Sequence, residues 1–502
     1  MQTLILQLEN DKASLPVVSM GRLMTDKGFL EKEIKRWLKS PERLNQIEGE
    51  QYYNGEQAIL RRERTVIDEN GQLQKVMHLP NNRIIDNQFA KMVDQKTNYI
   101  MGRSFSFDTE NKQYDLALQD VFSRKVKRLM RIVTENAYTG GRAWVYPYYD
   151  NAGVLAFTHF PAYEVLPFWA DNEHTILDCA VRLYPMTRYD DHGEAKTVYK
   201  VEVFHGGGID RFEWKDGALA PDPDVPPSGH ATVMVNGKET PYIWERMPLV
   251  CFKANHRETP LLRRVKCLQD ALNLMLSNFA NSMEEDVRNT VLVIRNYDGE
   301  DLGEFRRNLA TYGAIKVRSY DGRDGGVETL EIQVNAENFN AILDLLKNAI
   351  IENARGFDAK DDRLQGSPNQ LNIRSMYSDI DLDANELEIE FQAAFEELLW
   401  FVNQFLATSG KGAYDGVDVD VIFDRDILIN ESEAIDNCVK SEGILSKETI
   451  VKMHPWVDDP LKELVRIKDE EQEALNADPL RAAFLKNAPV LEGGDLNGNN
   501  TE

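Results

Sequence analysis

Four acidic side chains, Asp379, Asp381, Asp383 and Glu390, have the spacing of positions 1, 3, 5 and 12 in a calcium-binding loop. Such a loop needs a glycine at position 6 for its sharp turn, and this chain has Ala384 there. An apolar stripe at helical spacing also runs through the segment. We therefore expect a continuous helix with a solvated acidic face, and keep a cation site on it as the alternative.

The sequence contains no recognisable catalytic motif. Its eight histidines form no H-E-x-x-H pattern and no i,i+4 pair, and G-x-S-x-G, P-loop and dinucleotide-binding patterns are absent. Gly206-Gly207-Gly208 is followed by a predicted strand and not by a helix, so it predicts a β-turn and not a phosphate cradle. We predict no enzyme activity, no cofactor and no metal.

Cysteine use and charge narrow the function classes further. The spacings of Cys179, Cys251, Cys267 and Cys438 fit no zinc site, and we expect buried free thiols. The 83 acidic residues outnumber the 58 basic ones and give a net charge of −25. Such a chain repels DNA over most of its surface, so any DNA contact depends on a few local cations.

The basic residues with a suggestive position lie in and around predicted helices. Arg263, Arg264 and Lys266 lie at the start of one long helix, Lys347 lies on a second, and Lys360 and Arg363 lie in a polar loop. The alternative for each is a surface ion pair with one of the abundant carboxylates.

The elements that position these residues follow from hydrophobic periodicity. An α+β region is predicted over 26–256, with helices at 81–101 and 114–138 followed by strands and hairpin turns. Thr259-Pro260 is expected to cap a long helix ending near 285. A β-α-β-β module over 286–335 leads to a second amphipathic helix over 336–355, in which Phe339, Ile342, Leu346, Ile350 and Ala354 share one stripe.

The remaining segments are a polar loop, a longer helix and two loosely held ends. The loop covers 356–372, and a long helix with a return segment covers 373–430. Short helices are predicted over 431–475, a loose arm over 1–25 and a disordered tail over 476–502. No signal peptide and no apolar run of about 18 residues is apparent, so we expect a soluble, intracellular protein with no membrane partner. The 286–335 module is too small to hold a core alone, which predicts a ring whose neighbouring subunits supply the missing contacts.

From about residue 40 to 475 the chain resembles the SPP1-type portal protein family of long-tailed bacteriophages. Three stretches carry the resemblance: Tyr52–Arg62, with Tyr52-Tyr53-x-Gly55; Asn82–Gly102, with Phe89-Ala90-Lys91; and Leu371–Asn385, with Tyr377-Ser378. Their order, together with the helix–module–helix–loop–helix layout, makes the resemblance specific.

The resemblance implies a ring, probably of twelve subunits, at one capsid vertex of the virion, assembled in the host cytoplasm. The implied parts are a wing (26–256), stem helices (257–285 and 336–355), a clip (286–335), a tunnel loop (356–372), a long helix returning to the wing (373–430) and a crown (431–475). The implied partners are double-stranded DNA, the terminase large subunit, the major capsid and scaffolding proteins, and a head-completion or adaptor protein.

The resemblance also implies two groups of site residues. The DNA channel would contain Lys360, Arg363, Gln365, Asn369, Lys347, Arg263, Arg264 and Lys266. The partner-docking clip would present Arg295, Arg306, Arg307, Arg318 and Arg323. Another head–tail adaptor protein and a hydrolase that uses acidic residues remain the alternatives.

Overall fold

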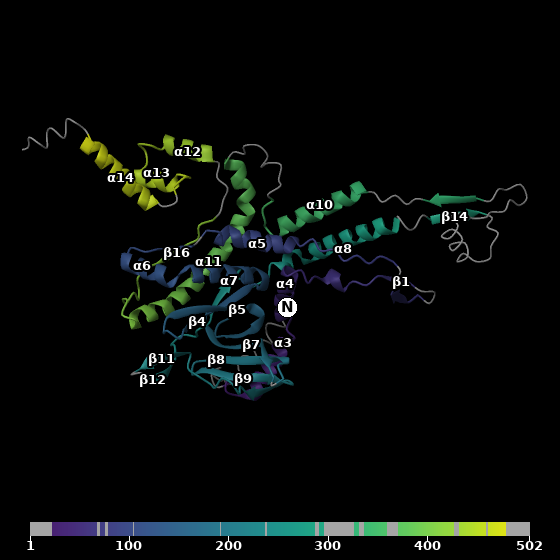
Figure 1. The fold of residues 1–502 in the computed structure, drawn as a ribbon, viewed down its shortest axis with the longest axis horizontal. Helices are drawn as coiled ribbons and strands as arrows, with labels where there is room; N and C mark the ends of the chain where they lie inside the picture. Colours follow the sequence, from purple (N-terminus) through teal and green to yellow (C-terminus); the bar gives the residue numbers. More distant parts are fainter. Residues whose placement is uncertain are drawn as a thin grey trace, which may run out of the picture. The chain divides into compact units, whose positions relative to one another are not determined.

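A computed structural model describes residues 23–67, 71–75, 79–103, 105–190, 192–235, 238–286, 291–295, 326–330, 336–358, 370–425, 431–457 and 460–477 (Figure 1). The chain divides into two compact units. The first contains Met1–Asp358 and Asp379–Asp426, and the second contains Ala359–Ser378 and Ile427–Glu502. The structure combines helices with antiparallel sheets, as the α+β prediction requires.

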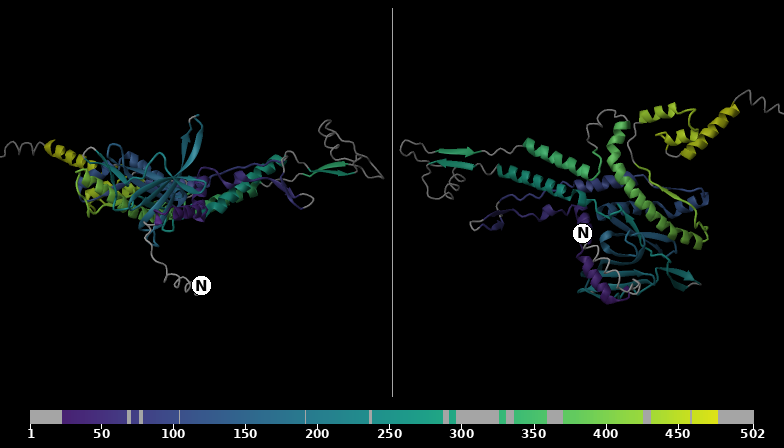
Figure 2. Two further views of the ribbon diagram at one scale, coloured as in Figure 1. Left: turned by 90° about the horizontal axis from the view of Figure 1, so that it is seen from below. Right: turned by 180° about the vertical axis from the view of Figure 1, so that it is seen from behind.

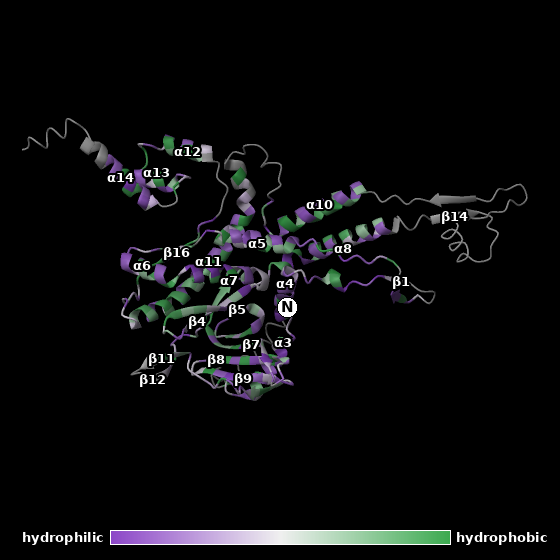
Figure 3. Cartoon of the chain, viewed as in Figure 1, coloured by the Kyte–Doolittle hydropathy of each residue, from purple (hydrophilic) through white to green (hydrophobic). Residues whose placement is uncertain are grey.

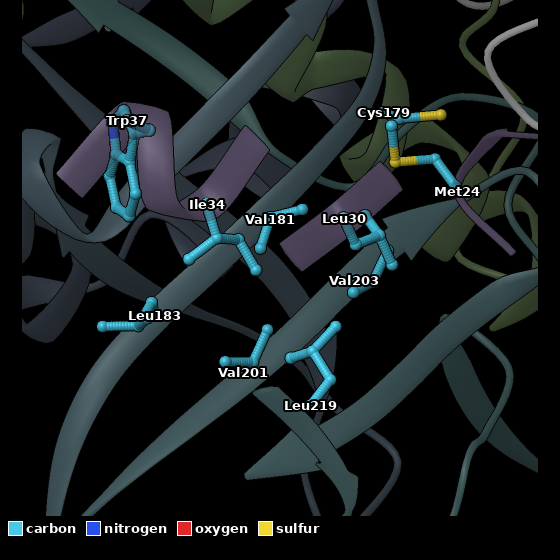
Figure 4. Packing of buried hydrophobic residues seen from close by; sticks show 10 residues of the cluster. All are labelled: Met24, Leu30, Ile34, Trp37, Cys179, Val181, Leu183, Val201, Val203 and Leu219. Carbon is cyan, nitrogen blue, oxygen red and sulfur yellow. The ribbon is translucent and has the colours of Figure 1, made fainter. Parts of the chain in front are cut away.

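The largest sheet has five antiparallel strands in the order β10-β9-β8-β7-β6. The strands are β6 (Val165–Trp169), β7 (Leu177–Tyr189), β8 (Ala195–His205), β9 (Gly208–Lys215) and β10 (Ala218–Pro221). His205 pairs with Gly208, so Gly206 and Gly207 form the hairpin turn that the sequence predicts. Helix α3 (Lys27–Leu38) buries Leu30, Ile34 and Trp37 against this sheet (Figure 4).

A second sheet connects the helices to the strands. It has the order β13 (Val250–Lys253), β4 (Arg142–Tyr149), β5 (Leu155–Pro161). Helix α7 (Arg124–Gly140) leads directly into β4 through Gly141, whose φ of +83° is left-handed. A Cβ at Gly141 would lie 2.2 Å from the Glu258 carbonyl oxygen, so only glycine fits this close approach.

The predicted helix over 114–138 is wrong in one respect, because it is two helices. Helix α6 (Lys112–Val121) is followed by Phe122, whose ψ of +54° is not helical, and Ser123 is the N-cap of α7. Phe122 is buried among Phe105, Phe107 and Phe395. The helix is therefore interrupted at Phe122, because burying this ring contributes more free energy than continuing the helix.

Helix α11 (Gln370–Thr408) is the longest element and carries the predicted apolar stripe. The described stripe residues are buried: Ile380, Leu387, Phe391, Ala394, Leu398, Val402 and Phe405. The stripe packs on an aromatic cluster that includes Phe252, and on the strand pair β3 (Ser106–Asp108) and β16 (Asp420–Ile422). Hydrophobic residues gather where α7, β4, β5 and α11 meet (Figure 3).

Helices α8 (Leu262–Asp286) and α10 (Ala336–Asn353) lie side by side and are linked by Phe279 and Phe339, whose ring centroids are 4.8 Å apart. Between them along the chain, β14 (Val291–Arg295) pairs antiparallel with β15 (Gly326–Leu330). The other two elements of the predicted β-α-β-β module lie outside the described residues. Helix α8 begins at Leu262, so the expected Thr259-Pro260 cap is misplaced. Ile342 is 42% exposed and does not belong to the buried stripe of α10.

The predicted helix over 81–101 is wrong for its first seven residues, because α5 covers only Gln88–Met101. Polar side chains of α8 hydrogen-bond the preceding segment instead. Asn281 accepts the N–H of Asn82 at 2.7 Å, Ser277 that of Ile84 at 2.9 Å, and Asn273 that of Asp86 at 3.0 Å.

The spacing of these hydrogen bonds explains the conformation. Two residues of extended chain rise about 6.6 Å and four residues of helix about 6.0 Å, so alternate N–H groups match successive turns of α8. Tertiary hydrogen bonds therefore override a helical pattern that the sequence shows.

The remaining elements of the first unit are short. They are α4 (Pro41–Tyr53), which packs on α7, the 3-10 turns η1 (Ala58–Arg61) and η2 (Ala162–Glu164), and the hairpins β1 (Thr65–Ile67)–β2 (Leu73–Lys75) and β11 (Ala231–Val235)–β12 (Lys238–Tyr242). The cysteine prediction needs a correction, because Cys267 on α8 is exposed while Cys179 and Cys438 are buried.

The second unit contains α12 (Glu431–Lys440), α13 (Lys447–Met453) and α14 (Pro460–Ala477), as the prediction of short helices requires (Figure 2). Ser446 caps α13 by accepting the Thr449 N–H. Among the described residues of the whole chain, no helix is long and apolar enough to cross a membrane.

Candidate functional site at the junction of four helices

Lys96 on α5 is the centre of a buried ion network in the first unit. It occupies the apolar stripe of its helix, one turn beyond Met92 and Val93, and its side chain is inaccessible to solvent. Its Nζ lies 2.8 Å from Asp383 Oδ2 on α11 and donates to the Arg355 carbonyl, just beyond α10, at 3.0 Å. Burial lowers the pKa of Lys96, and the Asp383 carboxylate opposes that effect.

Asp383 joins this lysine to α8. Its other oxygen, Oδ1, accepts from Arg264 Nη1 at 2.8 Å, and the aspartate is only 6% exposed. One carboxylate therefore neutralises two cations that come from different helices. A buried carboxylate with both oxygens paired is costly to leave with a single partner.

Further hydrogen bonds from α5 surround the network. Tyr99 donates its hydroxyl to Asp381, which also pairs with Arg425 Nη1 at 3.0 Å. Gln95 binds the backbone of Phe357 twice, donating to its oxygen at 2.6 Å and accepting from its N–H at 2.8 Å. Gln95, Lys96 and Tyr99 of α5 thus contact the chain just after α10 and the part of α11 that follows Ser378.

These contacts correct the expectation for the acidic segment. The helix is continuous, as predicted, but Asp383 and Asp381 face cations and do not belong to one solvated face. Asp379 alone of the three aspartates is exposed. The described carboxylates of this segment form no group of three whose oxygens lie close enough together to hold a metal ion.

Within the described part of the chain, three carboxylates elsewhere do lie close together. Oxygens of Glu213, Asp222 and Asp224 lie within 4.8 Å of one another beside the five-stranded sheet. Lys200 Nζ lies among them at 3.1, 2.7 and 2.9 Å. Burial would lower the pKa of Lys200, but its three carboxylate partners raise it. An ammonium group therefore fills the position that a metal would take.

Three of the four described channel candidates form ion pairs within the chain. Arg264 pairs with Asp383, Lys266 with Asp270 at 3.1 Å, and Lys347 with Asp86 at 2.8 Å. The ion-pair alternative therefore holds for these three. Arg263 is exposed and forms no ion pair with any residue that the structure describes.

The other predicted site residues cannot be placed. Lys360, Arg363, Gln365, Asn369, Arg306, Arg307, Arg318 and Arg323 lie outside the described residues, and Arg295 lies in β14 without a described side chain. Sequence reasoning missed Lys96, although a signal was present. A lysine at the position where the apolar stripe of Phe89, Met92 and Val93 continues indicates a buried, paired cation.

Comparison with known proteins identifies the class to which this architecture belongs. Residues 34–477 match the family of phage portal proteins described as SPP1 Gp6-like, and the chain belongs to that family. The portal protein of Bacillus phage SPP1 is 28% identical over 427 residues, covering 84% of this chain and 83% of that protein. The portal protein of Clostridium phage phiCD119 is 26% identical over 425 residues, covering 82% and 89%.

One solved structure is also similar, a chain from the neck of an empty GTA particle. It has a TM-score of 0.40 and 10% identity, and the match covers 72% of this chain and 88% of that chain. A likeness this weak carries no argument about fold. Family membership makes this chain a phage portal protein, a component of the virion at the portal vertex.

Proposed function

We propose that this chain is the structural subunit of a twelve-membered ring through which DNA is packaged and ejected. The family match over residues 34–477 carries this proposal. The ring requires no catalysis by the chain itself. Terminase, the capsid and scaffolding proteins and a head-completion protein or adaptor would dock on the assembled ring, and the chain would reach the virion after assembly in the host cytoplasm.

The parts of the chain have distinct roles in this proposal. Residues 26–256 form the wing, α8 and α10 the stem, 286–335 the clip and 356–372 the tunnel loop, while 431–475 form the crown. The paired strands β14 and β15 are consistent with a clip that begins and ends in one small sheet. The network around Lys96 supports a stem whose two helices are both fixed to α11 at their roots.

The negative net charge of the chain fits a channel that lets DNA pass without binding it tightly. Twelve subunits at −25 each carry about −300 formal charges, which repel the DNA backbone over most of the ring. Because Arg264, Lys266 and Lys347 are neutralised within the chain, we assign DNA contact in the stem to Arg263 first. The tunnel-loop residues Lys360 and Arg363 remain candidates beside it.

Negative-stain electron microscopy and native mass spectrometry of the purified chain test the ring. We expect rings with a central hole and a mass near twelve subunits. A protein that stays a compact monomer at all concentrations contradicts the proposal.

Arg263→Glu tests the channel assignment. We expect rings to form normally and DNA packaging to fall, because each copy then adds a repulsive charge to the channel. Lys32→Glu, at an exposed position of α3, makes the same charge change away from the stem and should leave packaging unchanged. Equal effects of both substitutions would remove Arg263 from the channel.

A further inference from the structure

Helix α8 lies between two layers of the first unit. One layer is α10, which packs on the face of α8 that carries Phe279. The other is an arm made of the described residues of 60–86, which lies along the polar stripe of Asn273, Ser277 and Asn281. The face that carries Phe279 and the polar stripe lie on different sides of α8, although Asp86 of the arm pairs with Lys347 of α10 at 2.8 Å at the root of the helix. Farther along, α8 lies between α10 and the β1 hairpin (Figures 1 and 2).

The arm is held by its backbone and leaves its outer edge open. The N–H groups of Asn82, Ile84 and Asp86 point to α8, so those of Arg83 and Ile85 point away from it. Neither of these two N–H groups has a hydrogen-bond partner among the described residues. At its tip, β1 pairs only with β2 within the described chain, and a lone two-stranded hairpin is marginally stable in water.

The outer surface of the arm is apolar and basic. Leu73 is 74% exposed, and Leu60 and Ile84 are also exposed. Arg61 and Arg83 are exposed and form no ion pair with described residues, although the charge of Arg83 also acts on exposed Glu63 of the same arm. An exposed apolar surface next to an open backbone edge indicates a site for association.

The outward face of α10 has the complementary character. Leu345 is 66% exposed and Ile342 lies one turn away on the same face. Asp344 and Glu352 are exposed beside them and have no ion-pair partner among the described residues. Apolar side chains flanked by carboxylates match apolar side chains flanked by arginines.

We propose that in the ring the arm of one subunit packs on the outward face of α10 of the adjacent subunit. A ring that closes by rotation needs two different, complementary faces on each copy, and the outer edge of the arm and the outward face of α10 are two such faces. Leu73 and Ile84 would cover Leu345 and Ile342, while Arg83 and Arg61 would face Asp344 and Glu352. This inference rests on the proposed ring.

Cross-linking tests the contact in assembled rings. In a background with exposed Cys267 replaced by serine, Leu73→Cys combined with Leu345→Cys is treated with a bismaleimide. We expect a ladder of covalent oligomers on a denaturing gel, because each copy links to the next. Either cysteine alone should give no ladder, nor should Leu73→Cys with Ile389→Cys, since Ile389 is an exposed residue of α11.

The outcomes separate the two proposals. Intact rings without a ladder, or with only links inside one chain, overturn the arm contact and leave the ring standing. Cross-links from α10 to a capsid or scaffolding protein would assign the outward face of α10 to that partner. They would also overturn the proposed contact with the arm. Failure of the unsubstituted chain to form rings contradicts the proposed function.

Charge reversal keeps the inference testable if the cysteine variants assemble poorly. Arg83→Glu and Asp344→Arg are each expected to weaken ring assembly about tenfold by placing like charges together. The double variant restores opposite charges and should assemble at least several-fold better than either single variant. Losses that simply multiply in the double variant would show that the two residues do not meet.

Discussion

Two buried lysines in the first unit are neutralised by different arrangements of carboxylates. Lys200 lies among three carboxylates, all within 24 residues of it along the chain. Lys96 has one carboxylate partner, Asp383, which is 287 residues away, and shares it with Arg264. The pKa of Lys200 is raised by its partners, whereas burial leaves the pKa of Lys96 lowered.

The Lys200 network connects parts of one sheet, whereas the Lys96 network connects several helices. The Lys200 network joins β8 and β9 to the segment just after β10, in a sheet whose strands are already paired, so the sheet holds its shape around it. The Lys96 network is a place where α5, α8 and α11 meet the end of α10. Desolvation offsets much of the attraction in a buried ion pair, so the clearest consequence of the Lys96 network is geometric: its contacts hold α5, α8 and α11 against the end of α10.

Removing Lys96 should have the largest effect. Lys96→Met leaves Asp383 buried with Arg264 as its remaining cation, and we expect the free energy of unfolding to fall by about 3–5 kcal/mol. Thermal or denaturant unfolding measures the change. Lys91→Met on the exposed side of α5 is the matched control and should change little.

A double variant sharpens the same prediction. Lys96→Met with Asp383→Leu removes both buried charges and should recover much of the lost stability, because apolar residues often replace a buried pair at little cost. A double variant less stable than Lys96→Met would show that Asp383 stabilises the junction through Arg264 alone.

Lys200→Met should cost less, about 2–3 kcal/mol at pH 7, because Arg188 and Lys215 still pair with Glu213. The effect should also depend on pH. Burial opposes ionisation of Glu213, but its cationic neighbours lower its pKa from 4.5 to about 2. A carboxyl with a lowered pKa stabilises the fold fully above its unfolded pKa, and this contribution is lost as the pH falls through about 2.

The stability gap between Lys200→Met and the unsubstituted chain should therefore be widest above pH 4.5 and narrow toward pH 2. Denaturant unfolding at a series of pH values measures it. A gap that stays constant over this range would mean that Glu213 is not held ionised by Lys200.

Hydrophobic periodicity correctly predicted a helix whose buried residues all lie along one side. The α11 stripe from Ile380 to Phe405 is buried because one side of a long helix faces one core. The same reasoning failed at Ile84 and Ile85, because the side chains that hold this segment extended lie about 190 residues later in α8. No local pattern contains that information.

Charged residues of the site could be singled out from the sequence, but the ion pairs between them could not be predicted. Arg264 and Asp383 were both recognised as charged residues of interest, one as a channel cation and the other as part of an acidic face. The structure pairs them across 119 residues. Lys96 was visible as a lysine in an apolar stripe, but its partner was not, since many of the 83 acidic residues would have served equally well on the sequence alone.

The smallest expected effect concerns a buried carboxylate that lacks a close cation. Burial in α11 raises the pKa of Glu397 from 4.5 to about 7, although Arg246 and Lys253 oppose this. A carboxyl with a raised pKa stabilises the fold only below its unfolded pKa, and the contribution is lost as the pH rises through about 7. Glu397→Gln should therefore leave stability unchanged at pH 4 and raise it at pH 8, by about 1 kcal/mol once the pKa shift is reduced for the solvent screening of a partly exposed side chain. Thermal unfolding at the two pH values measures this, with exposed Glu396→Gln as the control, and a gain of the same size at pH 4 would contradict it.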